Sequence, residues 1–133
     1  MLRMTRSLLD EMIAHCLVGL PDEACGLLGG DLATGTVDRL YLSENIARSA
    51  LVYTIDPTTH LHADRDAQAR GAAIIGVFHS HTHTEAHPSP TDVAQAPDPD
   101  WHYVIISLRA SSPAVRSYSI SDGQVAEEQI VLV

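Results

Sequence analysis

The stretch that most constrains this chain is an apolar run followed directly by a cluster of histidines. Residues 72–78 read Ala-Ala-Ile-Ile-Gly-Val-Phe, which predicts a buried strand. If the strand continues to His81, the side chains of His79 and His81 project from the same face, because side chains alternate along a strand. Their Cα atoms are then about 6.5 Å apart. That separation allows two imidazoles to bind one metal ion.

A carboxylate further along the chain, that of Asp92, supplies a third candidate ligand. Two imidazoles and one carboxylate leave the fourth position of a tetrahedral ion open for water, which is typical of a catalytic zinc site. The same donor set also suits Fe(II), so ligand type alone does not decide the metal. We expect one Zn²⁺ per chain, bound by His79, His81 and Asp92.

Two alternatives compete with this ligand set. Ser89-Pro90-Thr91-Asp92 is also a capping box, with Ser89 at the N-cap and an acidic residue three positions later, and capping alone would explain both residues. A shift of register would instead make His81 and His83 the ligands. Neither alternative predicts the whole spaced pattern of His-x-His followed by Ser-x-x-Asp.

That pattern resembles the motif of the JAMM (MPN+, Mov34/PAD-1) zinc isopeptidases. The matching residues are His79, His81, Ser89 and Asp92, and Glu23 fits the upstream glutamate of the family. The resemblance covers most of the chain. The fuller string is similar to the bacterial branch that releases cysteine from a ubiquitin-like sulfur-carrier protein, through Thr84-Glu85-Ala86 and Thr91-Asp92-Val93.

The resemblance implies a fold, a mechanism and a substrate. The fold is α/β, a curved mixed sheet of cytidine-deaminase-like type flanked by helices, in a single domain over residues 1–133. Glu23 is implied as the acid–base catalyst, and Ser89 as a donor to the oxyanion. The implied substrate is the amide at the C-terminal Gly-Gly tail of a small ubiquitin-like carrier. The alternatives are a deconjugase of other ubiquitin-like conjugates and a non-catalytic MPN interaction module.

Composition excludes several other classes of protein. Eight Lys and Arg against 17 Asp and Glu give a net charge of −9, which argues against a surface for nucleic acid or anionic membranes. No run approaches the ~18 apolar residues of a membrane span. A nucleobase deaminase needs Cys-x-x-Cys, whereas the two cysteines here, Cys16 and Cys25, are far apart and read as small buried hydrophobes. We therefore expect a cytoplasmic protein.

Hydrophobic periodicity, together with capping, proline and glycine residues, predicts the remaining helices and strands. A helix follows the N-cap Thr5 and ends before Pro21, and a second opens at Asp56-Pro57 and closes at Gly71. Asp122-Gly123 suits a type I′ hairpin turn. His60, His62 and His87 are predicted as surface or loop residues. Strands are expected at 24–28, 37–42, 101–108, 114–120 and 125–133, and β conformation at 51–55.

Overall fold

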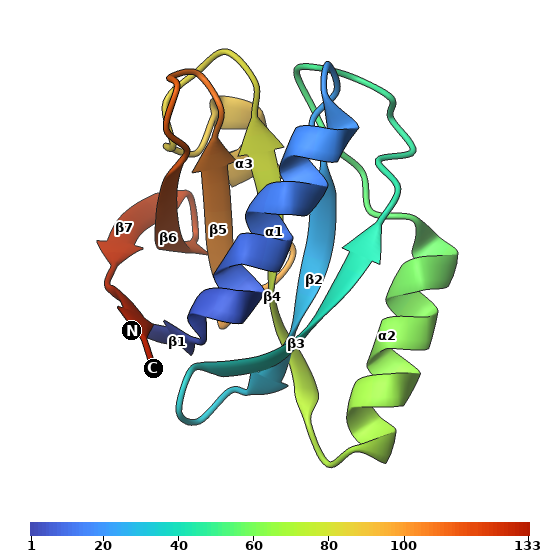
Figure 1. The fold of residues 1–133 in the computed structure, drawn as a ribbon. Coiled ribbons are helices and arrows are strands. Elements are labelled where there is room, and N and C mark those ends of the chain that lie inside the picture. Colours follow the sequence, from blue (N-terminus) through green and yellow to red (C-terminus); the bar gives the residue numbers. More distant parts are fainter.

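The computed structural model describes residues 1–133 (Figure 1). No helix in it is long and apolar enough to cross a membrane. The elements follow in the order β1 (Leu2–Met4), α1 (Arg6–Gly19), β2 (Cys25–Asp31), β3 (Thr36–Ser43), α2 (Pro57–Ala69), β4 (Ala73–His81), α3 (Pro90–Ala94), β5 (His102–Ser107), β6 (Ala114–Ser121), β7 (Gln124–Glu128) and β8 (Ile130–Leu132).

The eight strands form one mixed sheet in the order β7-β6-β5-β4-β2-β3-β1-β8. Strands β7 and β8 lie at opposite ends of this order, although only Gln129 separates them in the sequence. The sheet must therefore curl until its two ends nearly meet, and Figure 1 shows the last strands returning to β1 beside both termini. The expected α/β class with a curved mixed sheet is confirmed.

The two long helices cover opposite faces of the sheet, and each has its own apolar cluster. On one face, α1 packs Met12 and Cys16 against strand residues; on the other, α2 packs Ala63 and Ala67. Strand side chains alternate between these clusters: the α1 cluster includes Leu28, Phe78, Val104 and Ile106, and the α2 cluster includes Leu27, Val77, Tyr103 and Ile105.

A bulge in β4 decides which face the histidines occupy. Leu28 of β2 pairs with Gly76, but Gly29 pairs with Ile74, so Ile75 has no partner in β2. The extra residue shifts the alternation of β4 by one position. Beyond the bulge, Val77 packs in the α2 cluster, and His79 and His81 follow it on that face.

Local signals predicted several of these elements correctly. Thr5 caps α1 by accepting a hydrogen bond from Leu8 N–H at 3.2 Å, and Asp56 caps α2 in the same way from Thr58 N–H. Asp122 and Gly123 have φ values of 51° and 75°, the positive pair that a type I′ turn requires.

The prediction for the C-terminal end of the chain is wrong. Residues 125–133 were expected to form one strand, but the chain bends at Gln129, whose carbonyl accepts a hydrogen bond from Leu2 N–H at 2.9 Å. The bend lets β8 leave one end of the sheet and pair with β1 at the other. Strand β1 itself went unpredicted, because three residues are too few to show alternation.

Residues 51–55 do not form the β structure that their composition suggested. Only Ile55 makes a bridge, with Asn45. The Asn45 side chain satisfies this segment instead: its amide donates to Val52 O at 3.0 Å, and its oxygen accepts from Thr54 N–H at 3.0 Å. The buried side chain of Asn45 therefore supplies the backbone hydrogen bonds that a neighbouring strand would otherwise supply.

Glu128 holds the closure of the sheet. Its carboxylate accepts hydrogen bonds from His102 at 2.6 Å and Ser117 at 2.9 Å, and it pairs with the Met1 amino group at 2.8 Å. Burial would raise the pKa of Glu128, but these partners outweigh burial and lower the pKa to about 2. Ionised Glu128 therefore stabilises the folded state.

We expect Glu128→Gln to lower the free energy of unfolding by about 1–2 kcal/mol at pH 7. A lowered pKa gives stability above the ordinary value of 4.5 that is lost as pH falls toward 2, so the difference should vanish near pH 2. Denaturant unfolding at both pH values tests this. Glu127→Gln is the control, since its ion pair with Arg116 is about half exposed and worth little. Equal effects of both substitutions would contradict the role of Glu128.

Candidate metal centre

Three donor atoms converge at the end of β4 and the start of α3. His79 Nε2 and His81 Nε2 are 3.1 Å apart, and Asp92 Oδ2 lies 3.2 Å from the first and 3.0 Å from the second. A tetrahedral ion with bonds of about 2.0–2.1 Å holds its ligand atoms about 3.3 Å apart. The spacing of the three donors therefore fits a single metal ion, and we call these residues the three-donor group.

The hydrogen bonding of His81 favours a cation at this point. Its Nδ1 lies 2.8 Å from the carbonyl oxygen of Glu85, which can only accept, so Nδ1 carries the proton. In the neutral ring, Nε2 then has no hydrogen and carries a lone pair. It faces the carboxylate of Asp92, which also offers only lone pairs. These atoms attract each other only when a proton or a metal ion lies between them.

The pKa directions of the group agree with this interpretation. Burial lowers the pKa of His79, whereas Asp92 outweighs burial and raises the pKa of His81. Burial would raise the pKa of Asp92, but the two imidazoles lower it well below its usual range. The group therefore retains an ionised carboxylate and favours one added positive charge. A metal ion and a proton compete for the position between these three side chains.

The capping box of α3 places the carboxylate. Ser89 Oγ accepts from Asp92 N–H at 3.1 Å, and Ser89 N–H donates to Asp92 Oδ2 at 2.9 Å. Since Oδ2 is also the oxygen that faces both imidazoles, the capping box and the three-donor group share one carboxylate and do not exclude each other. The Ser89 hydroxyl accepts from Asp92, so its own proton stays free for another acceptor.

Glu23 lies just before β2, and its side chain is 5% exposed. Ser49 O accepts a hydrogen bond from its N–H at 2.8 Å, and the Asn45 amide donates to its carbonyl at 2.9 Å. Its Oε1 is buried without a hydrogen-bond partner. Burial raises the pKa of Glu23 to about 7, with His81 acting in the opposite direction. An unpaired carboxyl with this pKa suits proton transfer at neutral pH.

Comparison with known proteins identifies the family. Residues 5–121 match the model of the prokaryotic homologs of the JAB domain. The chain belongs to this family. It is 38% identical to the CysO-cysteine peptidase of Mycobacterium tuberculosis over 127 residues, which cover 95% of this chain and 87% of that protein.

Solved structures share the fold of this chain. A protein of Desulfitobacterium hafniense solved in solution has a TM-score of 0.91 at 39% identity, with 100% of this chain and 93% of that chain covered. A structure described as JAMM, a metalloprotease-like zinc site in the proteasome and signalosome, has a TM-score of 0.63 at 18% identity and covers 100% and 98%. With the mycobacterial relative, the family match makes the protein a JAB-type peptidase, and its three-donor group could hold a metal ion.

The remaining polar residues from the sequence pattern lie outside the three-donor group. His83 is exposed, so the alternative pair of His81 and His83 is not assembled. His87 is also exposed and packs edge-on against Tyr118. Cys16 and Cys25 are buried free thiols, as expected.

The sequence did not point to two residues that hold the loop behind His81. Three successive carbonyls of this loop accept hydrogen bonds: Thr84 O from Ser107 Oγ at 2.6 Å, Glu85 O from His81 Nδ1, and Ala86 O from Tyr118 Oη. Ser107 and Tyr118 are buried on β5 and β6. In the sequence, both look like ordinary strand residues. Their contacts with the loop arise only from the order of the strands in the sheet.

We expect Tyr118→Phe to weaken Zn²⁺ binding by about 10-fold, because freeing Ala86 O loosens the loop whose Glu85 carbonyl orients His81. Competition with a chromophoric chelator measures this affinity. Tyr103→Phe is the matched control, since Tyr103 is a buried tyrosine whose hydroxyl donates at 2.6 Å to Asp98 O, outside this loop. Both variants should lose about 1 kcal/mol of stability. Unchanged zinc affinity in Tyr118→Phe would mean that the loop does not orient His81.

Proposed function

We propose that the protein is a zinc peptidase that hydrolyses the amide after the Gly-Gly tail of a small ubiquitin-like sulfur-carrier protein and releases cysteine. The observation that carries the proposal is the three-donor group, together with the unpaired buried carboxyl of Glu23. The substrate comes from the name of the mycobacterial relative, a CysO-cysteine peptidase. Two buried free thiols support a reducing cytoplasm as the setting.

The donor chemistry supports zinc. Two imidazole nitrogens and one carboxylate oxygen, 3.0–3.2 Å from one another, leave a fourth position open. Held there by His79, His81 and Asp92, Zn²⁺ would act as a Lewis acid that lowers the pKa of the attacking water. The similar JAMM structure, described as a metalloprotease-like zinc site, supports the same choice.

The chain supplies proton transfer and charge stabilisation. Water adds to the carbonyl carbon of the scissile amide while Glu23 takes its proton. Glu23 then gives that proton to the leaving nitrogen as the C–N bond breaks, so the products are a free amine and the carrier's carboxylic acid, which loses its proton to water. The Ser89 hydroxyl only accepts in the capping box, so its O–H can donate to the oxygen that becomes negative during attack.

A cavity beside His79 supports an extended, small-residue tail. It measures about 260 Å³ and is lined by residues that include Tyr53, Thr54, Ile55, Gln95 and Pro97. Tyr53 stacks on His79, with ring centroids 4.2 Å apart, so one wall of the cavity contacts a residue of the three-donor group. A Gly-Gly tail would suit this cavity, because glycines let a backbone approach closely.

The matched variants Glu23→Gln and His79→Ala separate catalysis from metal binding. Glu23→Gln should keep its zinc but lose about 10²–10⁴-fold in turnover, because an amide cannot accept the proton. His79→Ala should lose both zinc and turnover, whereas His83→Ala should lose neither. Elemental analysis and turnover of the purified variants are the measurements. Wild-type turnover in Glu23→Gln would refute the assignment of the base.

The substrate is tested by mass spectrometry of a carrier–cysteine adduct incubated with the enzyme, with and without chelator. Loss of one cysteine residue only in the metal-replete sample is expected. A lysine-linked conjugate of the same carrier is the comparison. Efficient cleavage of that conjugate without cleavage of the adduct would make the enzyme a deconjugase. Inertness toward both, with metal bound, would favour a non-catalytic module.

A further inference from the structure

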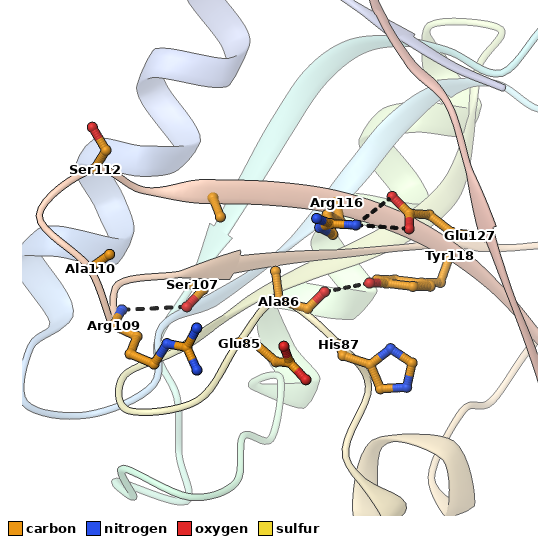
Figure 2. Close-up of a pocket in the computed structure, with 11 residues that line it drawn as sticks. Glu85, Ala86, His87, Ser107, Arg109, Ala110, Ser112, Arg116, Tyr118 and Glu127 are labelled. Carbon is orange, nitrogen blue, oxygen red and sulfur yellow. Dashed lines mark hydrogen bonds and ion pairs between the residues drawn. The ribbon is translucent and has the colours of Figure 1, made fainter.

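His79 and His81 are held in the three-donor group by different parts of the chain. The His81 ring is fixed by Glu85 O, in a loop that accepts a hydrogen bond from the Tyr118 hydroxyl (Figure 2). Both hydrogen-bond contacts of the His79 ring instead use Nε2, the atom that faces the other two donors. The orientation of this ring therefore depends on packing. Tyr53 packs flat against it, with ring centroids 4.2 Å apart and ring planes inclined by 19°.

Tyr53 lies in a segment that belongs to no helix or strand, between β3 and α2. One side chain, that of Asn45, fixes the backbone on both sides of it. The Asn45 amide donates to Val52 O at 3.0 Å, and its oxygen accepts from Thr54 N–H at 3.0 Å. Val52 and Thr54 are the residues directly before and after Tyr53. Asn45 therefore sets the position from which the Tyr53 ring reaches His79.

The same side chain also holds the residue proposed as the base. Asn45 Nδ2 donates to Glu23 O at 2.9 Å and to Ser49 O at 3.4 Å. Ser49 O in turn accepts from Glu23 N–H at 2.8 Å. With Ala47 N–H bound to its oxygen at 3.0 Å, Asn45 uses both N–H groups and both lone pairs of its amide. The side chain is buried, so water offers little replacement for these bonds.

Resting on the proposed function, we propose that Asn45 is a positioning residue that couples the base to the metal site. Through Glu23 O it fixes the backbone that carries the carboxyl, and through the backbone beside Tyr53 it fixes the ring that orients His79. A displacement of about 1 Å can cost about 10²-fold in rate. Loss of a contact that orients a metal ligand costs about 10–100-fold in metal affinity. One buried amide thus keeps the carboxyl and the metal ligand in a constant arrangement.

A double-mutant cycle on Zn²⁺ affinity tests the link to His79, and it needs no substrate. Asn45→Ala and Tyr53→Leu should each weaken Zn²⁺ binding by about 10-fold in competition with a chromophoric chelator. The double variant should bind Zn²⁺ about as weakly as either single variant, because Asn45 acts on His79 through Tyr53. Tyr118→Phe is the matched control. It acts on His81 through a different loop, so its loss should multiply with that of Asn45→Ala.

Two results of this cycle would overturn the proposal. Losses that multiply in the pair of Asn45 and Tyr53 would show that Asn45 does not act through Tyr53. Unchanged affinity in Tyr53→Leu would show that the stacked ring does not orient His79. Tyr53→Leu leaves the hydrogen bonds of Asn45 in place and should therefore fold. Where Asn45→Ala does not fold, Asn45→Ser replaces it, because its one hydroxyl proton can serve only one of Glu23 O and Val52 O.

The link to Glu23 is tested by turnover of the carrier–cysteine adduct at saturating Zn²⁺ and substrate. Asn45→Ala should lower kcat by about 10²-fold. In the Glu23→Gln background the same substitution should have little further effect, since the group that it displaces is already inactive. An equal fold-loss in both backgrounds would contradict the proposal.

Ser117→Ala separates positioning from stability. It removes a buried hydrogen bond to Glu128 at 2.9 Å and should lower the free energy of unfolding, while Zn²⁺ affinity and kcat stay unchanged. If it lowers both as Asn45→Ala does, the effects of Asn45 come from lost stability alone. A wild-type enzyme that leaves the adduct intact would contradict the proposed function, whereas the Zn²⁺ cycle still decides whether Asn45 positions His79.

Discussion

The candidate metal centre depends on the position of one oxygen atom, Oδ2 of Asp92. It accepts a hydrogen bond from Ser89 N–H and lies within 3.2 Å of both imidazole nitrogens. The capping box orients the carboxylate through the helix terminus, so the ligand is preorganised by the same bonds that begin α3. Its negative charge then makes a cation favourable where three lone pairs converge. Secondary structure and ligand geometry are coupled at this atom.

His79 and His81 face Asp92 because of the bulge earlier in β4. Ile75 has no partner in β2, and this extra residue sets which face Val77, His79 and His81 share. Gly76 lets β4 pass close to β5 here, because a Cβ at this position would collide with the carbonyl oxygen of His102. A one-residue change of register would turn both imidazoles toward α1. The bulge is therefore a determinant of the site although it contacts no ligand.

One short loop holds His81 in the candidate metal centre. Its carbonyls bind Ser107, His81 and Tyr118 in turn, so it is fixed from β4, β5 and β6 at once. His79 has no contact of this kind, and Tyr53 packs against its ring instead.

The sequence alone predicted the donors His79, His81 and Asp92 and the cap at Ser89, because strand alternation and a helix start are visible within this one short stretch. It supplied Glu23 only through resemblance to a family, since no pattern links that residue to a loop about 60 positions later. The tertiary structure alone decided the closure of the sheet at Gln129 and the support of the loop by Ser107 and Tyr118. Those contacts depend on the order of the strands, which is set by the packing of the whole sheet and has no signature in any short segment.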